Sequence, residues 1–384
     1  MIDGETAPGF EPVRRVFESN FEAEGEVGAG FCAYVGGQRV VDLWGGEARP
    51  GLPWGPDTPV VVFSTTKGAT AAVIALLVES GEIDPSLPVA DYWAQFAAGG
   101  KADIRVDQIL THTSGVVTFP GYVDVILDPG WWGDLDRIAD SFAPVEPEWE
   151  PGARHGYHGA SFGLLLNEVV RRATGRTIGT VLAEEFTDRL GLDFWIGTPP
   201  GAHDRVAHLI DASPATDPAL EAYLSLFTPE HLQGRAHLIG PDGITAVAGP
   251  FNTEAAWQAE FPSGGGVASA RGIAGLYDAL SRGGAGLLKR ATIDLMTRER
   301  VRGPDHVLLI ETAFGLGFMR PTPYISMGPS AAAFGHGGLG GSGGFADPAS
   351  GVAAGYAMNQ LKLPGPGVTT RMTLLVDALY ACLG

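Results

Sequence analysis

The feature that most constrains the fold is a long apolar helix that begins directly after a serine. An apolar run from Val60 to Phe63 leads into Ser64, and residues 69–78 then continue without proline or glycine as far as Gly81. This pattern predicts a helix that ends at a glycine cap and is apolar on every side. Such a helix must be buried, so the rest of the chain has to pack around it.

Ser64 and Lys67 are expected to lie on one face of this helix, because residues three apart are neighbours on a helix surface. A serine hydroxyl needs a base to remove its proton, and a desolvated, neutral lysine can act as that base. The helix N-terminus would also offer amides to an oxyanion. The alternative is a solvated lysine beside a capping serine. The chain has four lysines, and one stands in the opening turn of its most apolar helix, which favours a catalytic pair.

Composition limits the classes of partner. With 384 residues, 45% of them hydrophobic, the chain is a globular protein long enough for two domains. A net charge of −19 without a basic run argues against nucleic acid and against anionic membranes. We find no signal peptide, no membrane-spanning segment and two cysteines only, and we therefore expect a cytoplasmic protein.

Strand-like segments lie near both ends of the chain and helices lie between them. Residues 30–35 and 39–44 predict a hairpin, residues 306–311 and 351–358 predict strands, and residues 161–174 predict a helix. We therefore expect an α/β fold, an α+β sandwich in which helices flank one antiparallel sheet. The predicted domains are a discontinuous sheet domain of residues 1–85 and 255–384, and an inserted, mostly helical domain of residues 86–254 with lid loops.

Two further stretches are candidates for the same site. Tyr157 stands where a glycine-rich loop meets the helix at Ser161, and its phenol could move a proton if a nearby cation lowered its pKa. Residues 334–344 are rich in glycine, which predicts close approach to the backbone and a second oxyanion donor opposite Ser64. Ser342 satisfies the G-x-S-x-G pattern, but no histidine follows it, so we reject it as the nucleophile.

Aromatic residues gather in the long irregular segment that precedes Tyr157. Phe119, Trp131 and Trp132 either line an acyl pocket or pin this loop to the body of the protein, and the sequence favours neither. The histidines show no metal-binding spacing. We expect no metal and no cofactor.

With these motifs in place, the sequence resembles the serine β-lactamase and penicillin-binding-protein superfamily. Within it, the sequence is similar to the family VIII carboxylesterases, which look like class C β-lactamases. The matching segments are Ser64 to Lys67, Leu110 to Gly115, Pro151-Gly152 leading to Tyr157, Phe261 to Gly266 with Ala270-Arg271, and Phe334 to Asp347.

The resemblance implies a β-lactamase/transpeptidase-like fold in which Ser64 is acylated, Lys67 takes part in proton transfer and Tyr157 is the base. It also implies an oxyanion hole made by the amides of Ser64 and Leu339. His336, Gly337 and Gly338 stand where class C enzymes carry Lys-Thr-Gly, and we expect them at the substrate. For His336, orienting Tyr157 and a purely structural role stay open as well.

Two departures from the family pattern point to the substrate. Gly159 replaces the asparagine of Tyr-x-Asn, and His336 replaces the lysine of Lys-Thr-Gly. Both groups would hold a β-lactam, so we expect an esterase that hydrolyses small neutral esters through an acyl-enzyme. A β-lactamase, a D-amino-acid peptidase, an acyltransferase and a catalytically silent binding domain are the alternatives. The sequence leaves monomer and homodimer open.

Overall fold

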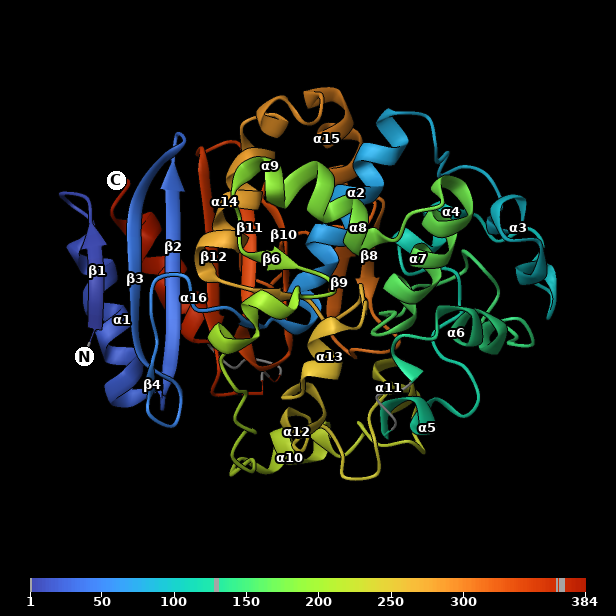
Figure 1. The fold of residues 1–384 in the computed structure, drawn as a ribbon, viewed down its shortest axis with the longest axis horizontal. Coiled ribbons are helices and arrows are strands. Elements are labelled where there is room, and N and C mark those ends of the chain that lie inside the picture. Colours follow the sequence, from blue (N-terminus) through green and yellow to red (C-terminus); the bar gives the residue numbers. More distant parts are fainter. Residues whose placement is uncertain (1, 128–130, 364, 366–369) are drawn as a thin grey trace.

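An antiparallel sheet built from both ends of the chain forms one side of the molecule (Figure 1). The computed structural model describes residues 2–127, 131–363, 365 and 370–384. The strand order is β1-β3-β2-β12-β11-β10, with β4 beside β3. The strands are β1 (Ile2–Thr6), β2 (Gly28–Val35), β3 (Gln38–Arg49), β4 (Leu52–Pro53), β10 (Phe334–Gly337), β11 (Gly343–Asp347) and β12 (Val352–Met358). The expected pairing of N-terminal and C-terminal strands is confirmed by β2 and β12, which pair along their length.

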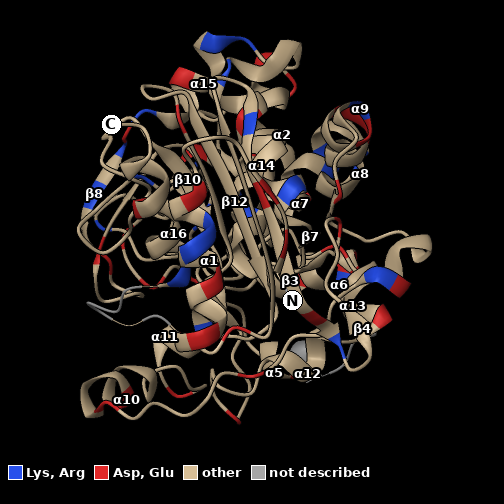
Figure 2. Ribbon diagram, turned by 90° about the vertical axis from the view of Figure 1, so that its left-hand side faces the viewer, with Lys and Arg blue, Asp and Glu red and all other residues tan. Residues whose placement is uncertain are grey.

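Helices cover both faces of this sheet. Figure 2 shows α1 (Glu11–Ala23) and α16 (Arg371–Ala381) on one face and α14 (Ala270–Ser281) on the other. Helix α14 lies so close to β11 that a Cβ on Gly344 would stand 2.3 Å from Ile273 and 2.6 Å from Tyr277. Part of the glycine-rich stretch therefore serves the packing of a helix on a strand.

Helix α2 (Thr66–Glu79) is the buried helix that the sequence predicted. It follows a short 3₁₀ turn, Phe63–Thr65, which leaves β5 (Val60–Val61). Strand β5 pairs with β7 (Val267–Ala268), and β7 pairs with β6 (Phe194–Trp195). Eleven of the fourteen residues of α2 are buried, because the helix lies between the large sheet and the helical part of the protein (Figure 1).

The middle of the chain consists of helices joined by irregular segments, and the helices between residues 89 and 174 lie on the side of α2 away from β1 (Figure 1). Its longest helix, α7, covers Ser161–Thr174 as predicted. The other helices there are α3 (Val89–Tyr92), α4 (Val106–Leu110), α5 (Tyr122–Leu127), α6 (Leu135–Phe142), α8 (Ile178–Leu182), α9 (Asp188–Leu190), α10 (Pro218–Leu224), α11 (Leu232–His237), α12 (Ala248–Phe251) and α13 (Glu254–Gln258). The predicted domain boundaries stay a prediction.

The strand predicted over residues 306–311 is wrong. The structure has β8 (Val301–Pro304), a turn, and then β9 (Glu311–Phe314), while α15 (Arg290–Thr297) precedes both. The Asp305 carboxylate accepts the amides of Val307 and Leu308, each at 2.8 Å, and this side-chain contact bends the apolar segment into a turn. Within the described residues, no helix is both long and apolar enough to cross a bilayer.

Candidate active site

Ser64 sits on a sharp turn that the residue before it makes possible. Phe63 has a φ of +42°, which is unusual for a residue with a bulky side chain. The Phe63 ring packs on Phe251 with their centroids 5.1 Å apart, and the Phe63 carbonyl accepts the hydroxyl of Thr66. These contacts hold a strained backbone conformation directly before Ser64, which lines a cavity, and such strain is frequent at functional sites.

Lys67 is fully buried and points at Ser64. Its Nζ lies 3.2 Å from the Ser64 Oγ, and it donates to the carbonyls of Gly159 at 2.6 Å and of Ser263 at 2.7 Å. No carboxylate among the described residues forms an ion pair with it. Burial therefore lowers the pKa of Lys67 well below its ordinary value. A neutral amine has two N–H groups, which the two carbonyls can occupy, and this leaves its lone pair for the Ser64 proton.

Tyr157 is brought to this pair from the loop that precedes α7. The Lys67 Nζ lies 4.9 Å from the centroid of the Tyr157 ring. The Tyr157 hydroxyl is buried, and it has no hydrogen-bond partner of normal geometry among the described residues. It nevertheless lies close enough to Ser64 for the Ser64 side chain to lower the pKa of Tyr157. Burial has the larger effect and raises the pKa of Tyr157. The sequence led us to expect the opposite direction, because it suggested a nearby cation, whereas burial disfavours the charged form of Lys67.

Asp305 holds the backbone of Tyr157 in place, a role that no sequence pattern predicted. One of its carboxylate oxygens accepts the amide of Tyr157 at 2.9 Å, and the other accepts the hydroxyl of Thr312 at 2.9 Å. Asp305 is 2% exposed. The Pro304-Asp305 pair could have been taken as a turn signal, but nothing in the sequence links it to a residue almost 150 positions away.

Replacing Asp305 with alanine is expected to lower kcat by about tenfold to a hundredfold, because a displacement of about 1 Å in a catalytic group can cost a factor of this size. Asp305→Asn keeps an acceptor for the Tyr157 amide and should retain most of the activity. Measurement of kcat and KM for both variants, with thermal denaturation as a fold control, tests this role. An unchanged kcat in folded Asp305→Ala would show that Tyr157 does not need this support.

The Leu110-to-Gly115 motif forms a second support for the Tyr157 loop. The His112 carbonyl accepts the Gly156 amide at 3.1 Å, and the Nδ1 of the His112 ring accepts the His158 amide at 3.0 Å. The His158 ring in turn contacts the Ser114 hydroxyl at 2.7 Å. Burial lowers the pKa of both His112 and His158. These side chains form a neutral framework behind Tyr157.

The glycine-rich hairpin lies across Ser64 from this framework. Leu339 begins a 3₁₀ turn one residue after the end of β10 and lines the same cavity as Ser64. Within the described residues, the amides of Ser64 and Leu339 donate to no protein acceptor, which leaves both available to an oxyanion. The Ser342 hydroxyl is buried and donates to the Val62 carbonyl at 2.8 Å, so it ties the hairpin to the turn at Ser64.

His336 is buried next to Tyr157, with the two ring centroids 5.9 Å apart. Its Nδ1 lies 2.7 Å from the Gly337 carbonyl, and burial lowers the pKa of His336 to about 3. The ring is therefore neutral and provides no permanent cation at the position of the family's lysine. His336, Gly337 and Gly338 are absent from the described residues that line the cavity at Ser64, so their predicted contact with substrate stays a prediction.

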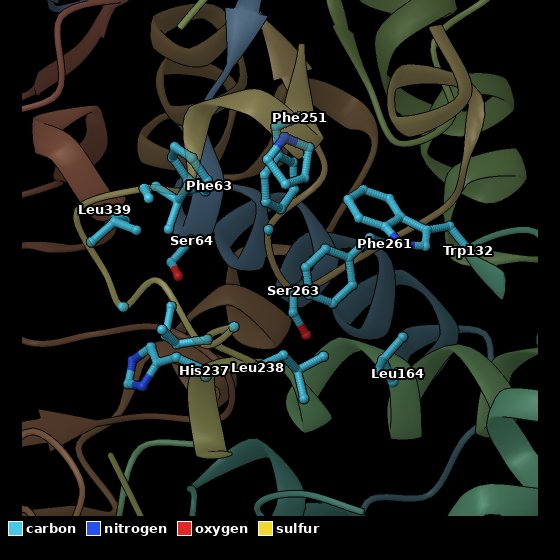
Figure 3. Close-up of a pocket in the computed structure, with 18 of the residues that line it drawn as sticks. Phe63, Ser64, Trp132, Leu164, His237, Leu238, Phe251, Phe261, Ser263 and Leu339 are labelled. Carbon is cyan, nitrogen blue, oxygen red and sulfur yellow. The ribbon is translucent and has the colours of Figure 1, made fainter. Parts of the chain in front are cut away.

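A cavity of about 210 Å³ opens at Ser64 and has mainly apolar walls (Figure 3). Trp132 lines this cavity, and its contact with an acyl group stays a prediction. Phe119 and Trp131 are not among its described lining residues: Phe119 packs on Phe142, and Trp131 stacks on Arg137. The sequence did not single out other lining residues, namely Phe63, Leu164, His237, Leu238 and Phe251.

Gly159, where class C enzymes have asparagine, has no room for a side chain. A Cβ there would stand 2.7 Å from the Ala236 carbonyl oxygen and 2.8 Å from the His237 ring. The Ala160 amide donates to the same Ala236 carbonyl at 2.9 Å. The segment that ends α11 therefore fills the space of the missing amide.

A comparison with known proteins agrees with this geometry. The family model described as "Beta-lactamase" matches residues 13–378. The chain belongs to the Beta-lactamase family. The "Esterase/beta-lactamase LipL" of Mycobacterium tuberculosis is 34% identical to this family member over 375 residues, which is 94% of this chain and 84% of the relative.

Two solved structures of the family cover the whole chain and are themselves covered completely. One is a family VIII carboxylesterase, with 36% identity and a TM-score of 0.86. The other is a novel penicillin-binding protein homologue from Caulobacter crescentus, with 40% identity and a TM-score of 0.85. The fold expected for this member of the Beta-lactamase family is confirmed.

Proposed function

We propose that the protein is a serine carboxylesterase that hydrolyses small, neutral carboxylic esters through an acyl-enzyme on Ser64. The observation that carries this proposal is the buried Lys67, whose Nζ lies 3.2 Å from the Ser64 Oγ without a carboxylate partner among the described residues. The esterase relatives support the same reaction class.

In the first step the Ser64 oxygen attacks the ester carbonyl carbon while Lys67 accepts the hydroxyl proton. The amides of Ser64 and Leu339 then stabilise the oxyanion. The bond from carbon to the alcohol oxygen breaks, and the alcohol takes a proton that Tyr157 passes on from Lys67. Because burial keeps Tyr157 protonated, we assign it the relay of protons and assign Lys67 the first proton transfer.

Water then hydrolyses the acyl-enzyme by a similar sequence of steps, in which water is the nucleophile and Ser64 is the leaving group. Lys67 or Tyr157 takes a proton from the attacking water, the second tetrahedral intermediate uses the same two amides, and the Ser64 oxygen leaves as a hydroxyl. No cofactor is needed for either half of this reaction. A cytoplasmic location stays a prediction, as does the choice between monomer and homodimer.

The β-lactamase alternative is weaker because the groups that would hold such a substrate are replaced. No lysine or arginine is found among the described residues that line the cavity, and His336 is neutral. A carboxylate on the substrate would therefore have no permanent countercharge.

The proposal predicts faster turnover of p-nitrophenyl butyrate than of a chromogenic cephalosporin, and a fluorophosphonate adduct on Ser64. Steady-state rates on both substrates, with mass spectrometry of the labelled protein, measure this. Ser64→Ala controls for labelling elsewhere and for background hydrolysis. Faster cephalosporin turnover would replace the esterase with a β-lactamase, and a wild-type protein without an adduct would favour a silent binding domain.

A further inference from the structure

The cavity beside Ser64 has one wall made of four aromatic rings, those of Phe63, Phe251, Trp132 and Phe261, which we name the aromatic wall (Figure 3). The rings of Phe63 and Phe251 have centroids 5.1 Å apart, as have those of Phe251 and Trp132. Trp132 and Phe261 follow at 6.4 Å. All three pairs are inclined by more than 50°, so edges and faces alternate along the wall, and this is the arrangement that aromatic groups prefer.

The interior of the cavity offers little to a charged group. Of its described lining residues only Asp242 and Glu260 carry charge. Asp242 is exposed to solvent, and the carboxylate of Glu260 accepts the Thr177 hydroxyl at 2.7 Å and the Gly179 amide at 3.1 Å. A charged substituent would lose its hydration without gaining a partner of opposite charge.

The size of the cavity fits an aromatic ring. A cavity of roughly 150 Å³ lined by leucine, isoleucine and phenylalanine stays dry and binds benzene. The cavity at Ser64 measures about 210 Å³ and has Leu164 and Ile138 among its lining residues. It therefore has room for a phenyl ring and a short linker to the reacting carbonyl.

Different parts of the cavity suit the two parts of an ester, the acyl group and the alcohol. His237 lines one part, and its ring lies 5.5 Å from that of Tyr157, the proposed proton donor to the leaving alcohol. In Figure 3 His237 lies below Ser64, whereas Phe261 and Trp132 lie to its right, so these residues border different parts of the cavity. Since the alcohol has to leave toward Tyr157, the part beside Phe261 and Trp132 is free for the acyl group.

We infer that the aromatic wall binds the acyl part of the substrate, and that this part is an uncharged aryl-alkanoyl group such as phenylacetyl. Burial of a phenyl ring should raise kcat/KM for p-nitrophenyl phenylacetate about tenfold to a hundredfold over p-nitrophenyl acetate. A charged acyl group of similar length, as in p-nitrophenyl hemisuccinate, should give no such gain. This inference rests on the proposed esterase function.

Neighbouring tryptophans offer a matched pair of variants. Trp132→Leu should lower the ratio of the phenylacetate kcat/KM to the acetate kcat/KM by about fivefold, because it removes aromatic contacts with the acyl group. Trp131→Leu changes a residue outside the cavity and should leave this ratio within about twofold of the wild type. Leu164→Trp fills the cavity and should also lower the ratio, which covers the case in which Trp132→Leu does not fold.

Each outcome of these assays decides something. If neither ester is hydrolysed and Ser64 takes no fluorophosphonate label, the proposed function itself fails. If acetate is hydrolysed but phenylacetate shows no gain, the inference fails while the esterase stands. A gain of benzyl acetate over ethyl acetate, without a gain from phenylacetyl, would place the ring on the alcohol side and overturn the assignment. If Trp131→Leu and Trp132→Leu lower the ratio equally, the aromatic wall does not bind the acyl group and the inference is overturned.

Discussion

Replacing Lys67 with methionine is expected to lower kcat/KM for ester hydrolysis by about a thousandfold, the loss typical when a general base is removed. Lys67 is the only lysine or arginine within hydrogen-bond reach of Ser64 among the described residues, and its Nζ is 3.2 Å away. Methionine fills a similar volume but cannot accept a proton, so the effect should lie mainly in kcat. Steady-state kinetics measure it, and circular dichroism checks the fold.

The pH dependence of the activity tests whether Lys67 acts as a neutral base or as a permanent cation. Lys67 can accept a proton only in its neutral form, and burial lowers its pKa well below the ordinary value. Activity should therefore be present at neutral pH and should fall as the pH drops through this lowered pKa. Lys67→Arg keeps a positive charge that proteins do not remove, and it should be inactive at every pH. An active Lys67→Arg enzyme would mean that Lys67 acts only through its charge and that another group is the base.

Most of the candidate site could be predicted from the spacing of residues within short stretches of the sequence. Ser64 and Lys67 are only three residues apart, and the apolar residues after them predict both the helix and its burial. Tyr157 could be proposed because its loop and helix boundary are visible in the sequence. The structure brings these three groups together, although their catalytic roles stay proposals.

Other parts of the site have no local signal. The carbonyls that hold Lys67 belong to Gly159 and Ser263, and every residue has a carbonyl, so nothing in the sequence marks these two. The support of Tyr157 by Asp305 depends on tertiary structure alone. The same residue explains the wrong strand at 306–311, because its side chain takes amides that a strand would have given to a neighbour. Phe251 ends the short helix α12, but the surrounding sequence shows no hydrophobic periodicity, so no pattern pointed to this residue.

Replacing Arg371 with methionine is expected to lower the free energy of unfolding by about 3 to 5 kcal/mol at mildly alkaline pH, the usual cost of leaving a buried charge unpaired. Arg371 is the first residue of α16 and is 5% exposed. Its guanidinium lies 3.1 Å from the Glu26 carboxylate and donates to the carbonyls of Glu24 and Gln360 at 3.0 and 2.8 Å. The contacts with Glu24 and Glu26 join α16 to the segment between α1 and β2, and the contact with Gln360 joins it to the residues that follow β12.

The size of this loss should depend on pH in a definite direction. Burial raises the pKa of Glu26 to about 7, although Arg371 opposes the rise. The folded protein thus holds a proton on Glu26 that the unfolded chain releases above its ordinary pKa of 4.5. Stability from this group is therefore fully present below about pH 4.5 and is lost as the pH rises toward 7. Without Arg371 the folded pKa rises further, so the charge-dependent loss grows above about pH 7.

Urea unfolding followed by circular dichroism at about pH 5.5 and about pH 8.5 measures this difference. At the lower pH Glu26 is protonated with or without Arg371, so the variant loses the hydrogen bonds of Arg371 but leaves no carboxylate charge unpaired. Glu26→Gln removes the titrating group, and Glu26→Gln combined with Arg371→Met should show the same loss at both pH values. If Arg371→Met alone loses equal stability at both, the carboxylate of Glu26 does not titrate in this range, and the cost comes from the carbonyl contacts of Arg371 instead.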